Sequence, residues 1–205
     1  MQEYTIKQEL YIIMKTLEQL LSDFDGRKAK SVSDLTTAFE DIAKRVLYGG
    51  FFEINDKTKI FPLEIEFYYY NENKQYPEDL NDNGMYHHNN KGKDDVPYFP
   101  IFTLYPHESG VDVTFENEKR KFRASFLIRK YHYVYADTDG VSDKPRYLWE
   151  DMFGLHSLSG NGFSIKWHDD TSFEVLDPKK SPRIHFNKYV DGKREEDRKP
   201  WLFSR

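Results

Sequence analysis

The sequence predicts a single α+β domain with a helical cap at its N-terminus. Apolar residues recur at spacings of three and four before residue 49, which is typical of amphipathic helices, and short β-type runs follow the Gly49-Gly50 pair. The 205 residues contain no internal repeat and no clean linker, and this length is typical of one domain. We therefore expect one domain that begins with helices and continues as a sheet.

Two helices are expected before the diglycine. The apolar positions of the first are Ile6, Leu10, Ile13, Leu17, Leu20, Leu21 and Phe24. Gly26 is expected to cap the C-terminus of this helix. The second helix is expected to begin near Ser33, an acceptable N-cap residue, and to stop at the diglycine. Residues 1–32 are accordingly assigned to an N-terminal helical extension and residues 33–205 to the main domain.

Two strands and a turn are expected directly after the helices. Residues 49–54 and 59–70 are apolar and aromatic runs, and Asn55 and Asp56 between them suit a tight turn. This pattern is typical of two adjacent antiparallel strands.

The second of these runs carries two acids in apolar surroundings. In a strand, Glu64 and Glu66 point to one face, whereas Ile65 and Phe67 point to the other. Tyr68 follows Glu66 on the acidic face. A carboxylate beside an aromatic ring suits a general base acting on a planar substrate, because the acid accepts a proton from water and the ring stacks on a base. The same pattern fits two glutamates that face solvent on an edge strand.

The remaining two thirds of the chain has mostly β-type character. Residues 71–95 are polar and long for a connection, which indicates a functional or disordered segment. Residues 97–135 favour strands, with turns at 107–110 and 116–120. The segments closer to the C-terminus are a short helix candidate at 146–155, strands or loops at 162–167, 172–176 and 183–188, and a charged turn at 191–200.

Composition excludes several classes of protein. The absence of cysteine excludes disulfides, thiolate metal sites and thiol catalysis. No apolar run reaches the length of a membrane span and no secretory signal is present, so a soluble cytoplasmic protein is expected. Residues 1–118 hold 12 basic and 22 acidic residues and residues 119–205 hold 18 and 13, so the C-terminal part could present a positive face to a polyanion.

Short motifs for phosphate, serine or metal chemistry are missing. The chain has no glycine-rich phosphate loop and no G-x-S-x-G elbow. His87 and His88 could bind a metal together with Glu64 and Glu66, but none of the usual zinc spacings occurs. We therefore expect neither a metal nor a cofactor.

A series of motifs in a fixed order resembles one enzyme family. In chain order they are "DIAKRVLYGGFFEI", "EIEFY", "HNNKG", "PIFTLYPHESGVD", "FLIRK", "MFGL", "SPRIHF" and "KPWLF". Over roughly residues 38–205 this order is similar to the alkyladenine type of 3-methyladenine DNA glycosylase. The resemblance implies a mostly antiparallel, curved sheet with flanking helices, and an enzyme of DNA base-excision repair that takes a damaged purine out of double-stranded DNA and hydrolyses its N-glycosidic bond.

The resemblance also implies roles for individual residues. Glu66 would activate water for attack on the sugar, and Arg129 would organise the water and the carboxylate. Tyr68 and Phe102 would stack on the flipped base, and His88 would donate or accept a hydrogen bond near it.

Two further positions complete the implied site. Tyr105 would insert into the gap that the flipped base leaves in the stack. Asp112 would stand where the family uses an Asn to shape the base pocket. No metal or cofactor is implied.

The chain also departs from the family pattern. Pro100 and Pro106 stand where a Tyr and a Gly are expected, Asp112 replaces a neutral side chain, and the net charge of −5 is unlike a basic family. These departures favour an alternative, a non-catalytic binding or interaction protein on a degenerate glycosylase-like fold. In that case the N-terminal helices could serve a protein partner.

Overall fold

The computed structural model describes most of the chain. The described residues are 15–73, 77–82, 85–86, 96–150, 164–170, 172, 174, 176–183, 187–190, 193–196 and 198–205. Within these residues no helix is both long and apolar enough to cross a membrane.

The described elements form an α+β fold, as the sequence predicts. The helices are α2 (Leu17–Asp23), α3 (Val32–Tyr48), the 3-10 turns η1 (Gly26–Lys28) and η2 (Glu78–Leu80), and a helical segment at residues 145–150. The strands are β1 (Gly50–Ile54), β2 (Thr58–Asn71), β3 (Leu104–His107), β4 (Gly110–Thr114), β5 (Phe122–Tyr135), β6 (Thr138–Ser142), β7 (Ile165–Asp169), β8 (Lys179–Ser181), β9 (Asn187–Val190), β10 (Lys193–Glu196) and β11 (Leu202–Ser204).

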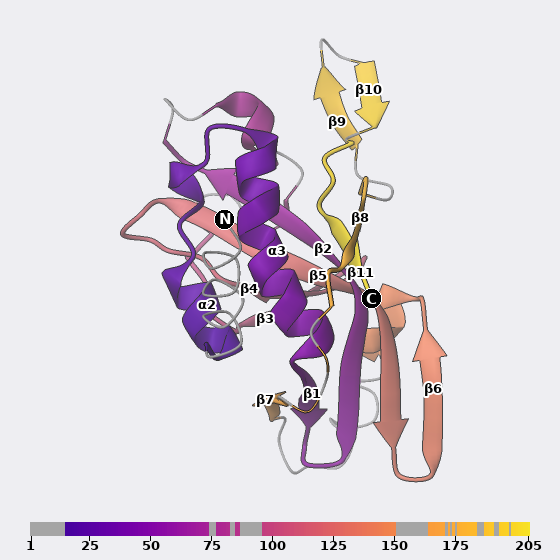
Figure 1. The fold of residues 1–205 in the computed structure, drawn as a ribbon. Helices are drawn as coiled ribbons and strands as arrows, with labels where there is room; N and C mark the ends of the chain where they lie inside the picture. The colour runs from indigo at the N-terminus through magenta and orange to yellow at the C-terminus, as the bar shows by residue number, and fades with distance from the viewer. Residues whose placement is uncertain are drawn as a thin grey trace.

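Nine of the described strands form one curved antiparallel sheet. Its main order is β3-β4-β5-β2-β1-β7. The long strands β2 and β5 pair with each other at the centre of the sheet. Along its other edge, each of them pairs with two shorter strands, one after the other. β2 pairs first with β1 and then with β11, and β5 pairs first with β4 and then with β6. Helices α2 and α3 lie against one face of the sheet (Figure 1).

The N-terminal helices begin at other residues than expected. The predicted helix from Ile6 does not run through Thr16, because Thr16 is extended and forms a capping box with Gln19 that starts α2 at Leu17. Residues before 15 lie outside the described part. Ser31 rather than Ser33 caps α3, and its hydroxyl accepts a hydrogen bond from the Asp34 backbone N–H.

Gly26 has a packing role instead of the predicted capping role. Helix α2 ends at Asp23, and Gly26 opens η1 against the ring of Tyr69. A Cβ atom at this position would lie 2.4 Å from Cε2 of Tyr69, so a larger residue would have to displace the Tyr69 ring.

The core between α3 and the sheet is built from aromatic rings. Phe39 of α3 stacks on Phe67 of β2 with ring centroids 4.5 Å apart, and the edge of Trp201 meets Phe39 at 5.2 Å. Phe24, which follows α2, stacks on Phe39 at 5.5 Å. Burying each such side chain stabilises the fold by roughly 1.5–3 kcal/mol. The described part of the predicted N-terminal extension thus shares the core of the main domain.

Paired bulges interrupt the register of β2 and β5. Glu64 pairs with Lys130, but the neighbouring pairs are Pro62 with Tyr131 and Ile65 with Ile128, so Leu63 and Arg129 have no partner in the register. Beyond the bulges, Ile65, Phe67 and Tyr69 belong to the core under α3. Because side chains alternate along a strand, Glu66 and Tyr68 point to the opposite face.

A buried ion pair holds the C-terminal segment to the edge of β2. Strand β11 pairs with β2 only as far as Glu66. Further along β2, the Asp82 carboxylate accepts a hydrogen bond from the Tyr69 backbone N–H at 2.8 Å, a bond that a neighbouring strand would otherwise make. Arg183 donates from both terminal nitrogens to Asp82 at 2.9 and 2.8 Å, and Lys199 donates to it at 3.1 Å. The Asp82 and Arg183 side chains are fully buried.

The charged segment 191–200 differs from its predicted form. Instead of a turn, residues 193–196 form strand β10, which pairs with β9 in a separate hairpin that projects away from the main sheet (Figure 1). In this register residue 190 pairs with residue 193 and residue 187 with residue 196, so the two strands are antiparallel along their whole length.

Replacement of Asp82 by alanine should destabilise the fold strongly, because it leaves the Arg183 charge buried without its carboxylate. We expect the free energy of unfolding, measured by urea denaturation, to fall by about 3–5 kcal/mol. The control is Asp177→Ala, which removes an exposed partner of Lys44 and should cost less than about 1 kcal/mol. Equal losses in the two variants would contradict a structural role for the buried pair.

Candidate functional site

Glu66 is a fully buried carboxylate on the sheet face opposite the helices. The Tyr68 hydroxyl donates to its Oε1 at 2.5 Å, and Nη1 of Arg129 lies 3.4 Å from its Oε2. An isolated buried carboxylate would be strongly unfavourable, and these two contacts help to stabilise Glu66 at this position. Glu66 is therefore not one of two solvent-facing glutamates.

The alternation of side chains along β5 explains how Arg129 reaches Glu66. Leu127 stands opposite Glu66 in the register, and Arg129, two residues further along β5, points to the same face. Arg129 is also the extra residue of the β5 bulge, which lies next to this contact.

A second buried carboxylate, Asp112, lies across the strands from Glu66, in the row of paired residues Glu66, Leu127 and Asp112. Glu66 pairs with Leu127, and Leu127 pairs with Asp112 on β4, so the two acids share a face two strands apart. At the usual strand spacing their Cα atoms are about 10 Å apart. Asp112 accepts a hydrogen bond from the Ser125 hydroxyl at 2.9 Å, and its Oδ1 lies 3.2 Å from Nε2 of His107.

Tyr68 is close enough to both carboxylates to feel their charges, and its hydroxyl stays protonated. Burial raises the pKa of its hydroxyl well above 10.0, and the negative charges of Glu66 and Asp112 raise it further. Arg183 on the far side lies 5.6 Å from the ring centroid and opposes this shift. Tyr68 is consequently a lasting hydrogen-bond donor to Glu66 at physiological pH.

The structure brings together most of the residues singled out in the sequence. Glu66, Tyr68, Arg129 and Asp112 form one group on the outer sheet face. Tyr105 pairs with Asp112 in the register of β3 and β4 and so lies at the β3 end of the same row.

Two of the singled-out residues are not part of this group. Phe102 packs against the core that α3 covers and lines a separate cavity of about 330 Å³ together with Phe52 and Trp167. The structure therefore does not bring Phe102 beside Tyr68, from which the central sheet separates it. His88 lies outside the described residues.

Sequence reasoning missed the residues that support the carboxylates. Ser125 and His107 hold Asp112, and no local pattern marks either as its partner. Arg183 belongs to the "SPRIHF" motif, but the sequence pattern assigns it no role in the site. Its guanidinium lies over the rings of both Tyr68 and Trp201, at 5.6 and 5.0 Å. The contact between Arg183 and Tyr68 joins segments more than 100 residues apart, so no local pattern in the sequence marks it.

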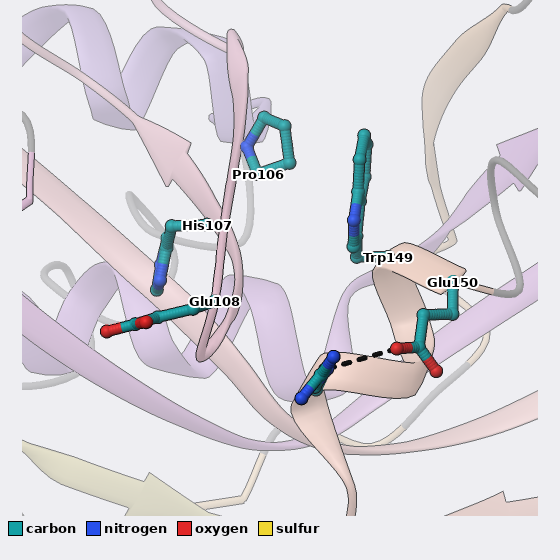
Figure 2. A pocket seen from close by; sticks show the side chains of 6 residues that line it. Pro106, His107, Glu108, Trp149 and Glu150 are labelled. Atoms are coloured by element: carbon teal, nitrogen blue, oxygen red, sulfur yellow. Dashed lines mark hydrogen bonds and ion pairs between the residues drawn. The ribbon is translucent and has the colours of Figure 1, made fainter.

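A cavity of about 480 Å³ opens beside the Asp112 end of the row (Figure 2). It is lined by Pro106, His107, Glu108, Arg146, Trp149 and Glu150. His107 lines the cavity and also contacts Asp112, so it connects the cavity to the buried carboxylates. Among the residues that the structure describes, no group of three or more His, Asp or Glu side chains could hold a metal ion.

Comparison with known proteins gives no match to a family model, to a curated protein or to a solved structure.

Tyr68 should make the stability of the protein fall at alkaline pH. A hydroxyl whose folded-state pKa lies above its unfolded value near 10.0 stabilises the fold fully below that value, and this contribution is lost as the pH rises. We expect urea denaturation to show a smaller loss of unfolding free energy above pH 10 in Tyr68→Phe than in the wild type. Tyr147→Phe, which removes an exposed hydroxyl, should follow the wild type. Identical pH profiles for all three proteins would contradict the assignment.

Proposed function

We propose that this protein is a nucleic-acid N-glycosylase in which Glu66 activates the attacking water. The observation that carries the proposal is the buried carboxylate of Glu66, held by a hydroxyl on one oxygen and by a guanidinium near the other. Such a carboxylate has a fixed orientation and little competing solvent, both of which a general base requires.

The reaction needs one water molecule and two contacts from the protein. Each oxygen of an ionised carboxylate can accept more than one hydrogen bond, so Glu66 can accept a water proton while Tyr68 and Arg129 remain in place. The water oxygen forms a bond to the sugar C1′, and its proton passes to Glu66. The bond between C1′ and the base nitrogen breaks, the electron pair leaves with the base, and the departing base takes a proton from solvent.

Arg129 and Tyr68 would act on the orientation of this step. The Arg129 guanidinium is a fixed donor that can bind the same water as Glu66 from one side. Tyr68 keeps Glu66 in one rotamer through its hydroxyl, and its ring belongs to a small apolar cluster with Met85 and Leu127. Tyr105 on β3 stands at the edge of the sheet, where an aromatic side chain could contact an opened duplex.

A second candidate is a non-catalytic binding protein in which the same group of residues only stabilises the sheet. The full burial of Glu66 and the nearly full burial of Tyr68 favour this alternative, because a substrate could reach Glu66 only after side chains above it moved. The two candidates differ in one measurable property, the release of a base.

Replacement of Glu66 by glutamine should abolish base release while preserving the shape of the side chain. We expect the rate of release from oligonucleotides carrying alkylated purines or hypoxanthine, measured by chromatography of the free base, to fall by about 100-fold or more. The matched control is Glu64→Gln, a glutamate two residues earlier on the same strand that should keep activity close to the wild type. If the wild type releases no base from any lesion in single- or double-stranded DNA, the catalytic candidate is wrong and the binding candidate remains.

A further inference from the structure

The cavity beside His107 has an aromatic wall on the side of the helical segment. Pro106 belongs to the hairpin of β3 and β4, and Trp149 belongs to the helical segment 145–150. Figure 2 shows the Trp149 indole, seen edge-on, across the cavity from Pro106. We refer to this space between Pro106 and Trp149 as the slot. An indole on one wall of a cavity suits a flat ligand that stacks on it.

The helix side of the slot offers both hydrogen-bond donors and acceptors. Glu150 supplies a carboxylate, and Nε of Arg146 donates to its Oε1 at 3.0 Å, whereas the Glu108 side chain extends to the other side of the hairpin (Figure 2). Carboxylates accept hydrogen bonds from exocyclic amino groups, whereas a guanidinium donates to ring nitrogens and keto oxygens. The polar groups of the slot therefore complement the edge of a nucleobase better than the edge of a purely apolar ring.

The hairpin wall of the slot is held rigidly before any ligand arrives. Tyr86 stacks on the His107 ring with centroids 4.1 Å apart, and His107 Nδ1 accepts a hydrogen bond from the Ser109 backbone N–H. The Tyr86 hydroxyl also donates to Glu108 at 3.0 Å. Asp112 holds the other nitrogen of His107. Such preorganisation lowers the entropic cost of binding.

Gly110 brings the two walls close together. Its φ of 144° lies in a region that L-residues rarely adopt, and a Cβ atom there would lie 3.0 Å from Cβ of Pro145 and 2.8 Å from Cδ1 of Leu127. Pro145 is the first residue of the helical segment that carries Trp149. The absence of a side chain at Gly110 thus determines how near that segment lies to the hairpin.

We propose that the slot binds an unpaired nucleobase of the substrate strand, distinct from the base that is released. Asp112 lies about 10 Å from Glu66 across two strands, and the slot lies beyond His107 at the Asp112 end of the row. A base in the slot is too far from Glu66 to be the leaving group, so it belongs to a neighbouring nucleotide. This inference rests on the proposed function and narrows the substrate to a nucleic acid that is single-stranded or opened around the reacting nucleotide.

The test is the binding of a short, labelled single strand of deoxyadenosine, followed by fluorescence anisotropy at constant salt. Base stacking on an aromatic ring predicts that Trp149→Leu weakens binding by about tenfold or more, whereas Trp149→Phe keeps most of the affinity. Trp167→Leu is the matched control, because Trp167 lines the separate cavity with Phe102. It should bind as the wild type does. Circular dichroism verifies that each variant is folded.

Three outcomes would overturn the proposal. These are an unchanged affinity in Trp149→Leu, an equal loss in Trp149→Leu and Trp167→Leu, and competition by free adenosine monophosphate as strong as that by the strand. The last would assign the slot to a free nucleotide. Because the deoxyadenosine strand carries no lesion, binding through the slot can be established even if no base is released. The failure of the slot and the failure of the glycosylase proposal are therefore distinguishable.

Discussion

The contact between Glu66 and Arg129 is the interaction on which the outer face of the sheet depends. A carboxylate at the centre of a nine-stranded sheet loses its hydration, which costs several kcal/mol unless a partner charge and hydrogen bonds replace the water. Arg129 supplies the partner charge, because it lies two residues beyond Leu127, the residue opposite Glu66, and its Nη1 is 3.4 Å from Oε2 of Glu66. This ion pair links the two central strands, whether Glu66 serves in catalysis or in the cohesion of the sheet.

The same arrangement recurs along β2 and β5. Besides Glu66 with Arg129, a buried Asp82 pairs with Arg183, and Arg123 lies 3.2 Å from Glu116 with both side chains almost fully buried. Apolar packing on the α3 side provides most of the driving force for folding, while these pairs fix which loops and terminal segments join the sheet. Removing one partner leaves the other as an uncompensated charge, and this is why the site and the stability of the protein are coupled.

The sequence predicted the fold class, helix α3 up to the diglycine, and the hairpin of β1 and β2 with its turn at Asn55 and Asp56. These features follow from local periodicity and turn chemistry. The first helix was predicted to run from Ile6 through Thr16, because the apolar spacing continues there, but the capping box at Thr16 starts α2 at Leu17. Strand β10 was missed because its composition is that of a charged turn.

For the candidate site, the sequence by itself determined which chemical groups are available: a carboxylate and an aromatic hydroxyl on one face of β2, and an arginine and a second acid further along the chain. Only the tertiary structure decided that Glu66 is buried, that Arg129 on the neighbouring strand lies next to it, and that Phe102 lies on the other side of the sheet. The physical reason is that local patterns encode the alternation of side chains along a strand. Burial, strand register and long-range ion pairs instead depend on segments that meet only in the folded chain.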